Sequence, residues 1–187
     1  HTRFKCDWSS DVCSSDLWAA DPIAFLYDMG VVHGTGAGRF NPGQPITRAD
    51  FVVMVARAFQ LSGGSETFSD VPYGSYYYSA VAAAKSLGIV QGYQGKFLPN
   101  TSLTRQDAMV ILKRTADTLG ITLPAGRSSL SQFQDAWQVA DYARGAVEAL
   151  VAAGVITGSD GRVNPKSPIS RAEMAAVLYR VLLLKSK

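Results

Sequence analysis

Three arginines begin three similar helix-forming segments, and their type and position suit them to bind an anion. Arg48, Arg105 and Arg171 each follow a Thr or Ser and stand two residues before an Asp or Glu. In the first turn of a helix the dipole disfavours a cation by about 0.3–1 kcal/mol, so folding does not explain them. A guanidinium can hold a carboxylate bidentately, beside backbone N–H groups that a helix start leaves unpaired. We predict an anion site; the alternative is a structural salt bridge to an acid such as Asp70 or Asp135 of another copy.

The hydroxyl and the acid that flank each arginine are explained by folding. A Ser or Thr at the N-cap accepts a hydrogen bond from the third helical N–H group, and an acid at that third position can return one. Such a cap stabilises a helix by about 1 kcal/mol. The predicted cap residues are Thr47, Asp50, Thr104, Asp107, Ser170 and Glu173. The arginine is therefore the functional candidate of each segment.

Aromatic residues and glycines also recur at equivalent positions. In each copy an aromatic residue stands 12 residues before a first glycine, and a second glycine stands four residues after that first glycine. An aromatic ring packs well against the CH face of a sugar, although ordinary packing at a helix start explains it equally well. The second glycines are expected to need positive φ and to let a ligand approach the backbone. These residues are Trp18, Tyr76 and Tyr142 among the aromatics, and Gly34, Gly92 and Gly158 among the glycines.

An internal repeat positions these residues. Each copy has a helical pattern that ends at a glycine, a Gly/Pro-rich loop with a Gly-basic-apolar triplet, and a more apolar second helix. We predict repeats over 17–62, 66–120 and 131–184. The first copy lacks the Phe-x-Asp segment that precedes the aromatic residue in the other two, so it is N-terminally incomplete.

Residues 1–16 form a polar leader without periodicity, and they contain both cysteines, Cys6 and Cys13. We interpret CDWSSDVCSSDL as translated sequencing-adapter read-through, so that the leader is non-native and receives no function. The alternative is a small loop closed by a disulfide between the two cysteines.

The composition argues against several classes of function. The net charge of +3, from 18 Lys/Arg and 15 Asp/Glu, is too mild to indicate a nucleic-acid partner. No apolar run is long enough to span a membrane, and two His and two Cys cannot supply a zinc site of usual spacing. The acids recur at cap positions rather than in one catalytic constellation. We therefore predict no catalytic residue, no metal and no cofactor.

The run FSDV…Y…A…LGIVQGY…GKFLPNTSLTRQDA resembles the S-layer homology module, and so do the other two copies. The family's Thr-Arg-Ala-Glu motif reads TRAD, TRQD and SRAE in this sequence, and the resemblance covers about residues 17–184. It implies an all-α fold in which three helix–loop–helix repeats form a pseudo-threefold spindle around a central three-helix bundle. It also implies an extracellular, non-catalytic module at the cell wall. Such modules bind secondary cell-wall polysaccharide, often pyruvylated, and tether the larger exported protein to which they are fused.

Carried over by position, the resemblance assigns ligand contacts to the three arginines, and groove-lining roles to Asp70, Asp135 and the three aromatic residues. We expect Arg→Ala at 105 or 171 to weaken glycan binding with little loss of fold. The sequence departs from the pattern at Gln106, at Ser170, and at Val163, where the other copies have Phe. The alternative function is a structural repeat scaffold for protein–protein interaction or self-assembly.

Overall fold

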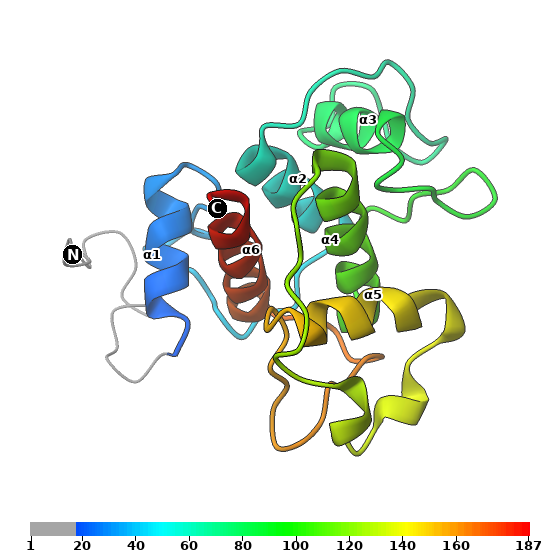
Figure 1. Ribbon diagram of the computed structural model, residues 1–187. Helices are drawn as coiled ribbons and strands as arrows, with labels where there is room; N and C mark the ends of the chain where they lie inside the picture. Colours follow the sequence, from blue (N-terminus) through cyan, green and yellow to red (C-terminus); the bar gives the residue numbers. More distant parts are fainter. Residues whose placement is uncertain (1–17) are drawn as a thin grey trace.

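The computed structural model describes residues 18–187, which form an all-α fold and confirm the predicted fold class (Figure 1). Within these residues only isolated β-bridges accompany the helices. The leader predicted at 1–16, with Cys6 and Cys13, lies outside the described residues. The helices are α1 (Ala20–Asp28), α2 (Arg48–Phe59), α3 (Tyr78–Ser86), α4 (Arg105–Leu119), α5 (Asp141–Ala152) and α6 (Arg171–Lys185), with 3₁₀ turns at Leu130–Gln132 and Ala136–Gln138.

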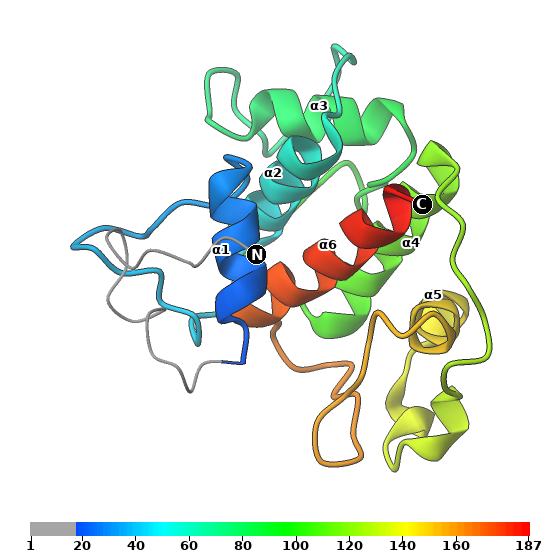
Figure 2. The same cartoon turned by 60° about the vertical axis from the view of Figure 1, so that its left-hand side comes forward.

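The first helix of each repeat packs on the second helix of the preceding repeat. Helix α3 packs on α2, α5 packs on α4, and α1 closes the circle by packing on α6. The second helices α2, α4 and α6 lie at the centre of the molecule, and α1, α3 and α5 lie outside them (Figures 1 and 2). No repeat therefore buries its apolar surface alone, as expected of a repeat protein. No helix of residues 18–187 is both long and apolar enough to cross a bilayer.

A ring of three backbone hydrogen bonds joins the repeats just before their second helices. The N–H of Ile46 donates to the carbonyl of Ile169 (3.0 Å), that of Leu103 to Ile46 (3.0 Å), and that of Ile169 to Leu103 (2.8 Å). All three side chains are buried. The ring fixes the starts of α2, α4 and α6 next to one another, so the three predicted arginines begin their helices close to this ring.

The outer helices end at the glycines that the repeat pattern predicts. Gly30, Gly88 and Gly154 have φ of 76°, 75° and 78°. Each donates its N–H to the carbonyl three residues earlier, and the next residue donates to the carbonyl five residues earlier. This pair of bonds is the Schellman motif, which needs a left-handed residue at that position. The prediction of C-terminal glycines is confirmed.

The second glycine of each repeat permits a close approach of the chain to itself. Gly92 and Gly158 have φ of 69° and 70°, as expected, but Gly34 does not have a positive φ, so the expectation is wrong there. The first copy has one extra residue in this turn, and a positive φ of 114° occurs at Gly36 instead. A Cβ on Gly34 would still lie 2.8 Å from the carbonyl oxygen of Arg39. The lack of room for a side chain therefore explains the glycine at that position.

Candidate functional site

The N-terminal amides of the second helices are already paired. Arg48 and Ala49 donate their N–H groups to the carbonyls of Thr101 and Pro99 in the next repeat's loop, both at 3.0 Å. The first two residues of α4 and α6 make the same two bonds to the loops of repeats 3 and 1. The expectation that the arginines stand beside unpaired N–H groups is therefore wrong, because the neighbouring loop supplies acceptors that the sequence of one helix cannot reveal.

The third helical N–H group is capped from within each helix. The side-chain oxygens of Thr47, Thr104 and Ser170 accept bonds from the residue three positions on, at 3.1, 3.3 and 3.1 Å. Only Glu173 completes the capping box, since its Oε1 accepts the N–H of Ser170 at 3.1 Å. The cap acids of the first two copies have different partners, described below.

Arg48 and Arg171 bind protein groups. The Nε of Arg48 donates to the carbonyl of Phe97 at 2.8 Å, and its guanidinium lies 5.1 Å from the centre of that ring. Arg171 repeats this with Phe40, at 2.9 and 4.5 Å, and its Nη2 also donates to the carbonyl of His33 at 2.9 Å. Arg171 is only 5% exposed. Burial lowers the pKa of Arg48 below the usual value, although nearby acids act in the other direction. Both side chains hold two repeats together.

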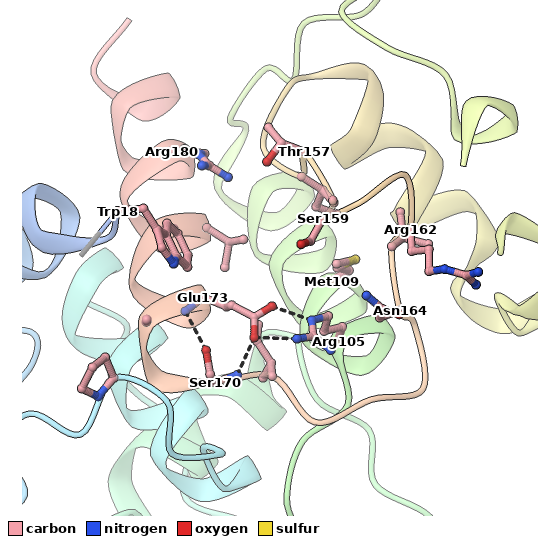
Figure 3. Close-up of a pocket in the computed structure, with 18 of the residues that line it drawn as sticks. Trp18, Arg105, Met109, Thr157, Ser159, Arg162, Asn164, Ser170, Glu173 and Arg180 are labelled. Atoms are coloured by element: carbon pink, nitrogen blue, oxygen red, sulfur yellow. Dashed lines mark hydrogen bonds and ion pairs between the residues drawn. The ribbon is translucent and has the colours of Figure 1, made fainter. Parts of the chain in front are cut away.

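Arg105 has a different partner. Its Nε and Nη2 donate to Oε2 and Oε1 of Glu173 at 2.5 and 2.6 Å, a bidentate ion pair. The side chains of Arg105 and Glu173 are 20% and 28% exposed. In Figure 3 they point toward each other at the edge of a pocket. The fork geometry predicted for a ligand carboxylate is thus present at this arginine, with an internal carboxylate in it.

The three equivalent aromatic residues also differ from one another, because two of them bond to a cap acid and the third does not have a hydroxyl group. The hydroxyl of Tyr76 donates to Asp50, and that of Tyr142 donates to Asp107 at 2.5 Å. Burial, and then the bond to a carboxylate, raises the pKa of each tyrosine to about 12. Trp18, at the equivalent position of the first copy, has no hydroxyl and is 61% exposed. It therefore presents an open aromatic surface.

Asp70 and Asp135 hold the loops of their own repeats. The two carboxylate oxygens of Asp70 accept the N–H groups of Phe97 and Leu98, both at 2.8 Å. Those of Asp135 accept the corresponding N–H groups of repeat 3 at 2.9 and 2.8 Å. Burial would raise the pKa of Asp70, but its backbone hydrogen bonds outweigh burial and lower it. The ion pairs of the arginines are instead with Asp107 (from Arg48, 3.8 Å) and with Glu173.

A pocket of about 660 Å³ lies where parts of all three repeats meet (Figure 3). Of the eleven residues predicted to bind a glycan, Trp18, Arg105 and Gly158 line it. Its lining also contains Arg162, whose guanidinium points away from the pocket in Figure 3, and Arg180; Glu173 is the single acid of the lining. The remaining predicted residues lie outside this lining: Arg48, Arg171, Asp70, Asp135, Tyr76, Tyr142, Gly34 and Gly92. Among residues 18–187 no cluster of His, Cys, Asp and Glu side chains could hold a metal ion.

Sequence reasoning missed Arg180. It stands nine residues after Arg171, and Arg57 and Arg114 stand at the same distance after the other two helix-start arginines. Each donates to the carbonyl of the residue after the glycine that ends an outer helix, at 2.8 Å for Arg180 and 3.4 Å for the others. Burial lowers the pKa of Arg180. The threefold recurrence of this arginine was the available signal.

Comparison with known proteins identifies matches along most of the chain. The sequence model of the S-layer homology domain matches residues 10–52, 67–109 and 132–175. The chain is 36% identical to a surface-layer 125 kDa protein of Lysinibacillus sphaericus, over 88% of this chain and 14% of that protein. It is 32% identical to an amylopullulanase of Thermoanaerobacterium thermosulfurigenes, over 89% and 9%, and 26% identical to the S-layer protein sap of Bacillus anthracis, over 89% and 20%. The chain thus spans a fifth or less of the length of these relatives.

Proposed function

Because this chain belongs to the S-layer homology domain family, we propose that it is a non-catalytic module that anchors a larger exported protein to a bacterial cell wall. The relatives support this role, since the same module accompanies both surface-layer proteins and an amylopullulanase and makes up a small share of each. A module common to proteins with such different names fits attachment better than any one reaction. Its location is the extracellular cell surface, and its cargo is the rest of the chain to which it is fused.

The observation that carries the binding proposal is the pocket beside Arg105. Arg105 and Arg180 line it against one glutamate, which favours an anionic ligand. The guanidinium of Arg105 already holds a carboxylate with two short bonds, so its fork is oriented for such a group. The volume of about 660 Å³ lies within the range of ligand pockets.

Trp18 supplies the second element of recognition. Its side chain lines the same pocket and is 61% exposed, so its ring can cover the CH face of a sugar. Ser159 and Asn164 line the pocket as well and offer hydrogen-bonding groups for hydroxyls. An aromatic surface beside a carboxylate-binding arginine suits a saccharide that carries an acidic substituent. We propose secondary cell-wall polysaccharide as the ligand, with a pyruvyl carboxylate bound by Arg105.

Sedimentation with isolated cell-wall sacculi tests this function. We expect the wild-type chain to be retained on sacculi and to be released when the wall polysaccharide is extracted. Arg105→Ala should lose retention, and Arg114→Ala, which changes an arginine outside the lining of this pocket, should keep it. Retention that survives extraction of the polysaccharide would contradict the proposal and favour a scaffold that binds protein.

A further inference from the structure

The backbone places the three helix-start arginines in equivalent surroundings. In each case the arginine N–H and the following N–H donate to two carbonyls of the next repeat's loop, at 2.9–3.0 Å. The ring of bonds between Ile46, Leu103 and Ile169 sets the same approach for all three helices. A difference between the arginine side chains therefore has to come from the side chains around them.

Two of the arginines occupy what we call the phenylalanine seat: the carbonyl oxygen and ring of one Phe in the neighbouring loop. Arg48 uses Phe97, and Arg171 uses Phe40. A cation over an aromatic ring is attracted by the ring's quadrupole, most strongly when the pair is shielded from water. The seat draws the guanidinium down onto the loop, where it links two repeats.

The loop that faces Arg105 has Val163 at this position. Valine keeps the backbone carbonyl but offers no ring. Val163 is 3% exposed and lines the pocket, so a ring at this position would extend toward the volume that is now open. Arg105 instead turns to Glu173 and lines the pocket itself.

We propose that Val163 is a positioning residue. Because it provides no phenylalanine seat, Arg105 faces the pocket, and this groove between repeats is the one that binds the ligand. The claim that this groove binds the ligand rests on the proposed function. Arg48 keeps its Phe97 contacts while its Nη1 also lies 3.8 Å from Asp107, so a nearby acid does not by itself draw an arginine off the seat. Glu173 is one methylene longer than that aspartate, so it reaches the unseated arginine and holds it in the fork geometry.

The state of Arg105 can be read without any ligand, from the Nε–H signals of arginine in ¹H–¹⁵N spectra. Arg48 and Arg171 are internal references for the seated state, in which the ring current shifts nearby protons upfield. We expect Arg105 in the wild-type chain to resonate apart from them, downfield, because its Nε–H donates to a carboxylate at 2.5 Å. Loss of the signal in Arg105→Lys assigns it.

Val163→Phe and the matched control Val163→Leu separate the ring from mere bulk. We expect Val163→Phe to move the Arg105 signal to the seated pair, and Val163→Leu to leave it in place. An unmoved signal in Val163→Phe, or the same shift in both variants, would overturn the positioning role. If Val163→Phe fails to fold, the reverse change decides: Phe97→Leu should release Arg48 from the seated position, and an unchanged Arg48 signal would refute the seat.

Binding of purified wall polysaccharide then tests the receptive groove. Val163→Phe should weaken it by about tenfold or more, as expected for loss of one charge-assisted interaction, and Val163→Leu, which adds bulk without a ring, should weaken it much less. Unchanged binding in Val163→Phe, with Arg105 seated, would overturn the claim that Val163 makes this groove receptive. A wild-type chain that binds no polysaccharide would refute the proposed function instead, while the spectra still decide whether Val163 positions Arg105.

Discussion

Replacement of Arg171 by alanine should cost stability, whereas the same change at Arg105 should not. Arg171 is 5% exposed, donates to the carbonyls of Phe40 and His33 at 2.9 Å each, and lies 4.5 Å from the Phe40 ring. A hydrogen bond to a charged group contributes about 1.5–3 kcal/mol, and the ring contact about 1 kcal/mol. Removal of a buried charge also ends its desolvation cost, which offsets part of this loss. We expect a net loss of about 3 kcal/mol.

Arg105→Ala is the matched control. Its ion pair with Glu173 is 20% and 28% exposed, and partly solvated pairs contribute about 1 kcal/mol or less. For a chain of this size, 3 kcal/mol corresponds to a fall in Tm of roughly 6–12 °C. Urea unfolding followed by far-UV circular dichroism, with thermal unfolding beside it, measures both variants. Equal losses of stability in the two variants would refute the division between a structural Arg171 and a binding Arg105. The sequence alone predicted little loss of fold for both.

Three further predictions concern the pocket, the loops and the aromatic contacts. Glu173→Gln should keep the helix cap, because an amide oxygen also accepts the N-cap N–H, and it should free Arg105. Calorimetry should then give about threefold or greater affinity for anionic wall polysaccharide. A weaker affinity would show that the glutamate is part of the site. Gly92→Ala should destabilise the fold by about 3 kcal/mol, because its Cβ would lie 2.4 Å from a phenylalanine ring. Gly95→Ala should cost only about 1 kcal/mol, because no atom lies within 4 Å of its added Cβ. Similar urea midpoints for the two variants would contradict this prediction. Tyr142 should ionise near pH 12. Since its folded pKa is raised, its contribution to stability is complete below pH 10 and is lost as the pH rises through 12. In an absorbance titration, Tyr142→Phe should lack one late transition of the wild-type chain, and loss of a transition near pH 10 instead would refute the prediction.

The local elements could be predicted from the sequence because their signals are local. The glycines that end the outer helices and the Thr/Ser residues that cap the second helices act within a few residues of their own position. The arrangement of the repeats could not be predicted in the same way. The packing of α1 on α6, and the pairing of Arg48 and Ala49 with the next repeat's loop, join residues far apart in the chain. Tertiary acceptors therefore removed the free amides on which the first argument for an anion site depended.

The candidate site was predicted in part, for a related reason. The repeat pattern treats all three arginines alike, and only the surroundings of each guanidinium separate Arg105 from the other two. Val163 was visible as a departure from the pattern, but its meaning depends on which arginine faces it across the repeat boundary. Arg180 was visible as a recurrence, and its place beside Trp18 in the pocket follows from the closure of α1 onto α6.

The most direct test of the anchoring proposal is calorimetry of the wild-type and Arg105→Ala chains against purified wall polysaccharide, with and without its pyruvyl groups. The proposal predicts that the wild-type chain binds the pyruvylated polymer, and that removal of pyruvate or of the Arg105 guanidinium weakens binding to a similar extent. The two changes together should have little more effect than either alone, because they remove the same contact. Full wild-type affinity in a folded Arg105→Ala variant would contradict it.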